Sequence, residues 1–150
     1  MKTKLIVTEN EARYLMLIYR RQVENFSDFG TTDIARFLKV RPATDTEALQ
    51  NLAKKKLVKH RPYHGVQLTK RGVREAQKLL RRHRILELFL SDFLKYNVRK
   101  SCLEASKIDY HVSSSLINDI CRLYGHPRTC PCKKDIFADP SCLKEGVKAK

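Results

Sequence analysis

The chain has 150 residues, 42% of them hydrophobic and 31% charged, and 31 Lys and Arg against 16 Asp and Glu give a formal net charge of +15. This composition excludes a disordered chain and predicts one globular domain, or one domain with a small appendage. The chain has no apolar run of about 18 residues, and acids interrupt its N-terminal segment. We therefore expect no membrane span and no signal peptide, and predict a cytoplasmic protein.

The first elements predicted along the chain are three helices. Thr8 and Glu11 form a capping box that opens a helix over residues 9–22, whose apolar residues recur at helical spacing. Two shorter helices follow over residues 33–38 and 43–55, joined by a tight turn. This pair predicts a helix-turn-helix, whose second helix enters the major groove of DNA.

A hairpin and three more helices are predicted next. Alternating apolar residues around residues 63–65 predict a short β-hairpin, which would make the unit a winged helix. Thr69 then caps a long helix that extends to about Tyr96, and further helices are expected over residues 100–110 and 114–124. The remaining residues are expected to be loop-like, with a lysine-rich tail.

The long helix has two unlike halves. Its first half is basic and its second half, from Ile85, is apolar, which predicts one end that faces DNA and one that faces a partner. The apolar residues exceed what one small domain can bury alone, so we expect a homodimer. The residues expected at its interface are Leu86, Phe89, Leu90, Phe93 and Leu116.

Positive charge is concentrated over the helix-turn-helix. Between Arg36 and Arg84 there are fifteen Lys and Arg against three acids. A basic run alone is more often a solvated face, but its overlap with this motif predicts binding to the phosphates of double-stranded DNA. Base contacts are expected from the start of the second helix, where one of Asp45 and Glu47 either reads a base, as Glu47 could read cytosine, or caps the helix. Phosphate contacts are expected from the basic residues that flank this helix. The candidate DNA-binding residues are Arg41, Thr44, Thr46, Glu47, Gln50, Lys55, Arg61 and, at the wing tip, His64.

Five segments resemble the diphtheria-toxin-repressor and manganese-transport-regulator family. They are residues 68–72, 83–90, 102–105, 109–113 and 123–131, and the resemblance covers about residues 9–137. It implies a homodimeric transcriptional repressor that binds a palindromic operator when Fe²⁺ or Mn²⁺ is abundant. The chain is similar to the short form of the family, without the C-terminal β-barrel domain.

The predicted fold class is mostly α, a winged helix-turn-helix followed by an α-helical dimerisation domain. The expected boundaries are residues 1–75 for the DNA-binding domain, 76–137 for the helical metal-binding and dimerisation domain, and 138–150 for a basic tail.

His83 and Glu87 are four residues apart on one helix face, a spacing that lets an imidazole and a carboxylate share one ion, although it also suits an ordinary surface pair. The resemblance implies that both are metal ligands, that Cys102 stands where some members have a histidine ligand, and that Asp109 stands where a glutamate ligand is usual. We favour Fe²⁺ for this site, with Zn²⁺ or Mn²⁺ as alternatives. A second family site is expected to be degenerate, because non-ligand residues occupy ligand-like positions. These residues are Arg13, Met16 and Tyr110.

All five cysteines lie at or beyond Cys102, which argues against a chain-wide disulfide framework. A second candidate cluster, for zinc or an iron–sulfur centre, has weak spacing, so buried or solvent-exposed thiols are the preferred alternative. Its members are His126, Cys130, Cys132 and Cys142. Cys121, on an apolar helix face, is expected in the core.

The function we predict is sequence-specific transcriptional repression responsive to a divalent metal such as iron. Two alternatives stay open: a thiol- or iron–sulfur-based sensor on the same fold, and a basic RNA-binding winged-helix protein. No nucleophile–base pair or phosphate-binding loop is recognisable, so we expect no enzyme.

Overall fold

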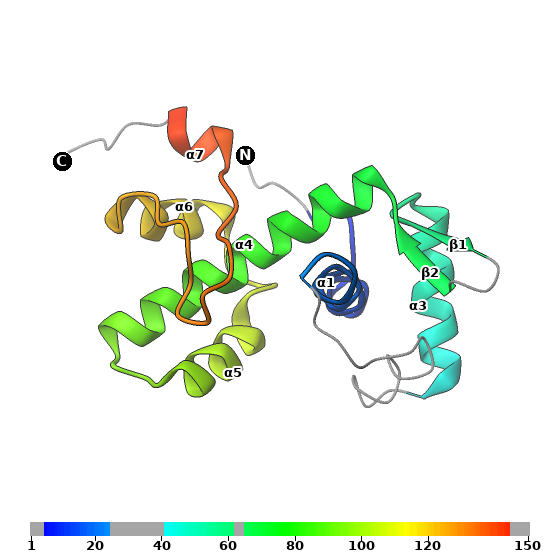
Figure 1. The fold of residues 1–150 in the computed structure, drawn as a ribbon, viewed down its shortest axis with the longest axis horizontal. Helices are drawn as coiled ribbons and strands as arrows, with labels where there is room; N and C mark the ends of the chain where they lie inside the picture. The colour runs from blue at the N-terminus through cyan, green and yellow to red at the C-terminus, as the bar shows by residue number, and fades with distance from the viewer. Residues whose placement is uncertain (1–4, 25–40, 62–64, 145–150) are drawn as a thin grey trace. The chain divides into compact units, whose positions relative to one another are not determined.

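The computed structural model describes residues 5–24, 41–61 and 65–144 (Figure 1). The chain divides into two compact units: the N-terminal unit is Leu5–Gln77, and the C-terminal unit begins at Lys78. None of the helices found in the described residues combines the length and apolar character needed to cross a bilayer.

The first helix, α1 (Glu9–Val23), begins at the predicted capping box. The Thr8 hydroxyl accepts from the backbone N–H of Glu11, and the Glu11 carboxylate accepts from the backbone N–H of Thr8. Two backbone N–H groups at the helix start, which have no partner within the helix, are therefore satisfied. Near the other end, the Gln22 amide donates to the carbonyl of Val66 and accepts from the N–H of Leu68, which joins α1 to the wing.

The second helix of the predicted helix-turn-helix is α3 (Pro42–Lys54). It begins with a proline at its first position, where the missing N–H costs nothing, and its Ala48 and Leu52 are buried. The helix expected over residues 33–38 lies outside the described residues.

The wing is an antiparallel pair, β1 (Val58–Arg61) and β2 (Gly65–Leu68). Its tip, residues 62–64, lies outside the described part of the chain. The long helix α4 (Lys70–Phe93) follows, and the Thr69 hydroxyl accepts from the N–H of Gly72 at its start.

The C-terminal unit contains the second half of α4 and the helices α5 (Val98–Ile108), α6 (Ser114–Leu123) and α7 (Pro140–Lys144). α4 ends three residues before the expected Tyr96. α7 was not predicted from the sequence, because a helix of five residues is too short to show a hydrophobic period.

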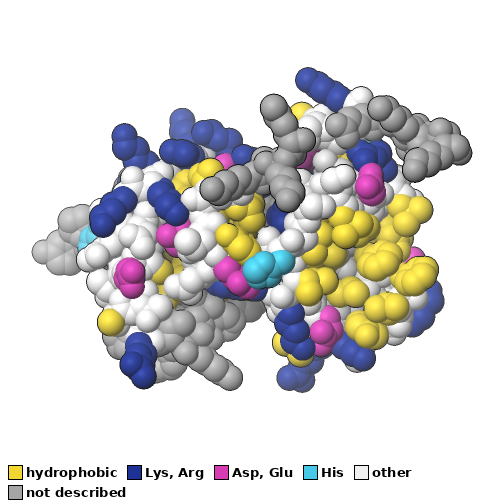
Figure 2. All heavy atoms as spheres, turned by 180° about the vertical axis from the view of Figure 1, so that it is seen from behind, with side chains coloured by type: hydrophobic (Ala, Val, Ile, Leu, Met, Phe, Trp, Pro, Cys, Tyr) yellow, Lys and Arg dark blue, Asp and Glu magenta, His cyan; other side chains and the backbone are white. Residues whose placement is uncertain are grey.

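The apolar half of α4 contributes to the core of its own unit, which changes the expected dimer interface. Leu86 and Leu90 are buried in that core, whereas Phe93 is 69% exposed and Leu116 is 49% exposed. Phe89 is half-buried and stacks on Phe93. Figure 2 shows hydrophobic side chains gathered on one face of the C-terminal unit.

Three arginines of α4 are buried, contrary to the expectation that its whole basic half faces DNA. Arg81, Arg82 and Arg84 are all less than 8% exposed. Arg82 donates to the backbone carbonyls of Asp109, Tyr110 and Val112, and burial lowers the pKa of its guanidinium. Arg84 donates to the carbonyl of Asp135. These side chains stabilise the loops of the C-terminal unit.

Candidate functional site

The centre of the candidate site is His83, on the buried side of α4. Its Nδ1 lies 2.9 Å from Oδ2 of Asp109, and both residues are 3% exposed. Because a carboxylate only accepts, Nδ1 donates this hydrogen bond, and in the neutral imidazole the lone pair is then on Nε2. Metal-ligating histidines commonly have this arrangement, in which a carboxylate accepts a hydrogen bond from the ring nitrogen that does not bind the metal.

Two further donor atoms surround Nε2 of His83. Cys102 Sγ lies 3.4 Å away and Glu87 Oε2 lies 3.7 Å away, and the three ligand atoms all lie within 4.8 Å of one another. Metal–ligand bonds of about 2.0–2.3 Å in a tetrahedron place neighbouring donors about 3.3–3.8 Å apart. The observed separations match this range.

Glu87 belongs to a second group of donors, formed with Cys130 and Cys132. The Cys132 thiol donates to Glu87 Oε1 over 2.6 Å. Burial, with the hydrogen bond to Glu87 and its charge, raises the pKa of the Cys132 thiol to about 12. Glu87 is 1% exposed, and a buried carboxylate between an imidazole and thiols is a donor set that fits a divalent transition metal.

The structure shows where the ligands predicted from the sequence lie. His83, Glu87 and Cys102 lie together, whereas Asp109 lies behind His83 and contacts its other nitrogen. Cys132 contacts the other oxygen of Glu87, which spacing could not reveal because it is 45 residues from Glu87.

The second predicted cluster does not form as a single group. Cys130 and Cys132 lie beside Glu87, while His126 and Cys142 lie beside Cys121. The two pairs separate because the loop that contains residues 130–132 packs against α4, and α7 returns to α6.

The predicted DNA-contacting residues lie mainly on α3. Arg41, Thr46, Glu47 and Gln50 are exposed and Thr44 is half-buried, so the first turns of the helix face outward. Glu47 does not cap the helix, because Arg41 is its N-terminal flanking residue. The side chain of Arg61 and the whole of His64 lie outside the described residues.

Lys55 has a different partner from the phosphate we expected. Its Nζ lies 2.5 Å from Oε2 of Glu11, which is 4% exposed. This pair ties the end of α3 to the start of α1. Three lysines beside it are exposed and suit phosphate better: Lys54, Lys56 and Lys59.

These features define a winged-helix DNA-binding unit followed by a helical unit with a buried metal-type donor set. Residues 6–66 match the family model of the iron dependent repressor N-terminal DNA binding domain. Residues 69–138 match the model of the iron dependent repressor metal binding and dimerisation domain.

Two transcriptional regulators are similar to this chain in sequence. An uncharacterised HTH-type transcriptional regulator of Methanocaldococcus jannaschii is 32% identical over 104 residues, which are 69% of this chain and 83% of that protein. The HTH-type transcriptional regulator MntR of Bacillus subtilis is 32% identical over 115 residues, which are 77% of this chain and 80% of MntR.

Solved structures show the same fold. The manganese regulator SloR superposes with a TM-score of 0.74 and 28% identity over 87% of this chain, but the match spans only 60% of SloR. A hypothetical protein of Sulfolobus solfataricus superposes with a TM-score of 0.67 and 26% identity, over 88% of this chain and 100% of its own.

The chain belongs to the iron-dependent repressor family. It is a DNA-binding transcriptional regulator on a winged helix-turn-helix fold, as the sequence predicted. The family consists of transcriptional repressors and not of enzymes, which confirms that prediction as well.

Proposed function

We propose that the protein is a metal-responsive repressor whose ion is held by His83, Glu87, Cys102 and Cys132. The single observation that supports this most is the burial of Glu87, which is 1% exposed and whose two carboxylate oxygens lie 3.7 Å from His83 Nε2 and 2.6 Å from Cys132 Sγ. A carboxylate placed so deep in protein is stabilised by a cation.

The donor atoms also indicate which metal is preferred. One nitrogen, one carboxylate oxygen and two sulfurs suit Fe²⁺, Co²⁺ or Zn²⁺ better than Mn²⁺, because thiolates prefer softer ions. When bound, the ion would supply positive charge that stabilises the Glu87 carboxylate and both thiolates. Asp109 would keep the imidazole of His83 oriented toward it.

We propose α4 as the link between the ion and DNA. The same helix contributes His83 and Glu87 to the donor set and, at its start, packs Gly72 against the chain beside the wing. An ion that fixes the second half of α4 therefore acts on a helix whose first turn supports the wing.

The operator we propose is palindromic and is bound by a homodimer. The support is the family's dimerisation domain and the apolar face that includes the exposed side chains of Phe93 and Leu116. A twofold dimer presents two recognition helices to two half-sites about one turn of DNA apart.

The thiol-sensor alternative is less well supported. Burial raises the pKa of Cys121, Cys130 and Cys132, and a thiol that keeps its proton reacts slowly with oxidants.

The metal assignment is tested by counting bound ions. Zn²⁺ is titrated into chelator-treated protein without oxygen, and bound metal is measured by elemental analysis after gel filtration. Glu87→Gln should lose one equivalent relative to wild type, because it removes the ligand charge at nearly constant volume. Glu104→Gln, which changes a glutamate paired with Lys107 on the surface of α5, is the matched control. Equal metal content in Glu87→Gln and wild type would refute the assignment.

A further inference from the structure

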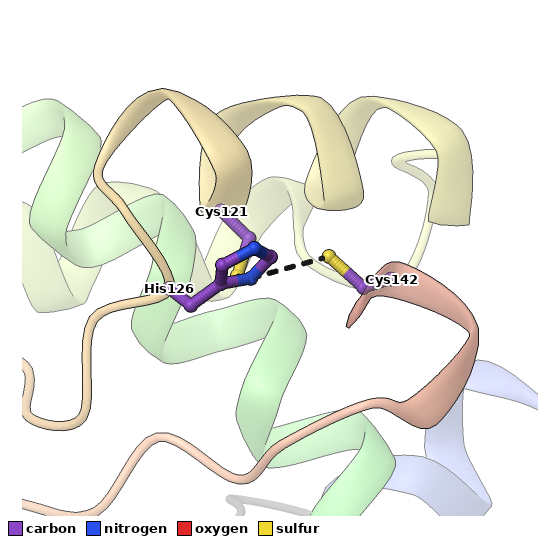
Figure 3. Close-up of side chains that lie close together, drawn as sticks. All are labelled: Cys121, His126 and Cys142. Carbon is purple, nitrogen blue, oxygen red and sulfur yellow. Dashed lines mark hydrogen bonds between the residues drawn. The ribbon is translucent and has the colours of Figure 1, made fainter. Parts of the chain in front are cut away.

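A second group of donor atoms lies in the C-terminal unit and shares no residue with the first. Cys121 is on α6, His126 follows that helix, and Cys142 is on α7. Figure 3 shows the three side chains pointing toward one another. Its Nδ1 is 3.5 Å from Cys121 Sγ and 3.8 Å from Cys142 Sγ, and the three atoms all lie within 4.8 Å of one another.

These separations are those of a zinc site. Bonds of about 2.3 Å to sulfur and 2.0–2.1 Å to nitrogen place tetrahedral neighbours about 3.5 Å apart for sulfur and nitrogen. Two thiolates and one neutral imidazole are also among the commonest ligands of Zn²⁺.

The backbone places the three side chains so that their ligand atoms lie close together. Gly125 and His126 both have positive φ, 65° and 57°, and the N–H of His126 donates to the carbonyl of Cys121. This left-handed turn is unfavourable for a histidine, yet it returns the imidazole to α6. Cys142 is 1% exposed, and its thiol lies against the carbonyl of Asn118 on the same helix.

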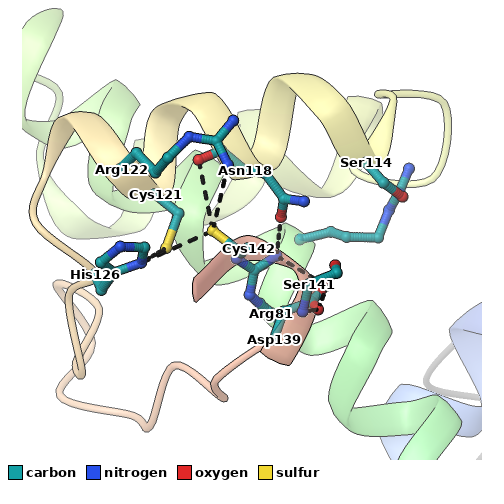
Figure 4. A network of polar contacts seen from close by, with 10 residues as sticks. Arg81, Ser114, Asn118, Cys121, Arg122, His126, Asp139, Ser141 and Cys142 are labelled. Atoms are coloured by element: carbon teal, nitrogen blue, oxygen red, sulfur yellow. Dashed lines mark hydrogen bonds and ion pairs between the residues drawn. The ribbon is translucent and has the colours of Figure 1, made fainter. Parts of the chain in front are cut away.

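Two guanidinium groups lie beside the three ligand atoms. Figure 4 shows Arg81 and Arg122 beside the group. Arg122 Nη1 lies 4.0 Å from Cys142 Sγ, and Arg81 lines the same cavity as Cys121 and His126. Two thiolates would offset the charge of a divalent ion, so a neutral centre could lie beside these guanidinium groups without repulsion.

There is room for a fourth ligand. Cys121 and His126 line a cavity of about 310 Å³, whose wall also includes Arg81 and Asp139. Within the described residues, Nε and Nη2 of Arg81 are buried and have no hydrogen-bond partner. A water molecule in this cavity would complete a tetrahedron and meet polar atoms.

We propose that Cys121, His126 and Cys142 form a second metal site, which takes Zn²⁺ or another thiophilic divalent cation. The ion would fasten α7 to α6 and so fix the end of the described chain to the C-terminal unit. The site is independent of the proposed sensory site, because its ligands come from other residues.

The test uses the full chain purified without oxygen and loaded with Zn²⁺. Wild type should bind two equivalents per chain, and His126→Asn should bind one, because asparagine tolerates positive φ but lacks the imidazole. Cys142→Ser should also bind one. Leu143→Ala, which changes an exposed residue on the same helix, should bind two.

Further measurements separate this site from the alternatives. Glu87→Gln combined with His126→Asn should bind no Zn²⁺, whereas Glu87→Gln alone should keep one equivalent. Circular dichroism of His126→Asn in chelator should match that of wild type in chelator, which verifies that the variant is folded. Equal zinc content in wild type, His126→Asn and Cys142→Ser would overturn the proposal. A disulfide between Cys121 and Cys142 in the oxygen-free protein would also overturn it.

Discussion

Replacing Gly72 with alanine should destabilise the N-terminal unit. An added Cβ would lie 1.9 Å from the carbonyl oxygen of Leu57, where real Cβ atoms essentially never come closer than 3.0 Å. The start of α4 and the chain before β1 would therefore have to move apart by roughly 1 Å.

The expected loss of stability follows from the hydrogen bonds that the Leu57 carbonyl accepts. This carbonyl accepts from the N–H of Thr69 at 3.0 Å and from the Thr69 hydroxyl at 3.2 Å. The Thr69 hydroxyl also donates to the carbonyl of Lys56 at 2.7 Å, so the bond at risk is that of the Thr69 N–H, whose loss costs about 1 kcal/mol. Overpacking costs about 1–3 kcal/mol, and alanine regains about 1 kcal/mol of helix propensity over glycine. The net loss in free energy of unfolding should be about 1–3 kcal/mol.

Urea denaturation followed by circular dichroism measures this loss. Arg74→Ala is the matched control, since Arg74 is exposed on the same helix, and it should change stability by less than about 0.5 kcal/mol. A Gly72→Ala protein as stable as wild type, or more stable, would refute the close packing of α4 against the wing.

Three further predictions concern the dimer, the ligand shell and DNA. Phe93→Asp should give monomers in analytical ultracentrifugation while keeping the helical content of wild type, since Phe93 is 69% exposed; a dimer of unchanged affinity would place the interface elsewhere. Asp109→Asn should weaken metal binding about 10–100-fold in a chelator competition, because His83 loses its orienting carboxylate, whereas Asp119→Asn on the surface should not; equal affinities would remove Asp109 from the site. Gln50→Ala should narrow the gap between operator and random DNA by about 1–3 kcal/mol, and Lys54→Ala should instead make the salt dependence of binding shallower; the reverse pattern would exchange their roles.

Local signals in the sequence predicted the elements well. The Thr8–Glu11 capping box fixed the start of α1, and the end of that helix differs from the expected one by a single residue. The hairpin and the start of α4 also follow the expected pattern, because turn residues and caps act over a few neighbours.

Contacts between residues far apart in the sequence could not be predicted from local signals. The burial of Arg81, Arg82 and Arg84 depends on partners that lie 27 or more residues later in the chain, and a basic run looks the same whether it is solvated or buried. Likewise, the contact of Cys132 with Glu87 arises only when the loop after α6 folds back on α4.

The most direct test of the central claim is DNA affinity with and without metal. An operator duplex is selected from a random pool with zinc-loaded protein, and its binding is measured by fluorescence anisotropy at fixed salt. For wild type, adding Zn²⁺ or Fe²⁺ should raise the affinity for this duplex to at least ten times the affinity for random DNA. His83→Ala should abolish that increase, and the exposed control His111→Ala should keep it. If metal leaves the affinity of wild type unchanged, or if His83→Ala responds like wild type, the buried His83–Glu87 site is not the sensor.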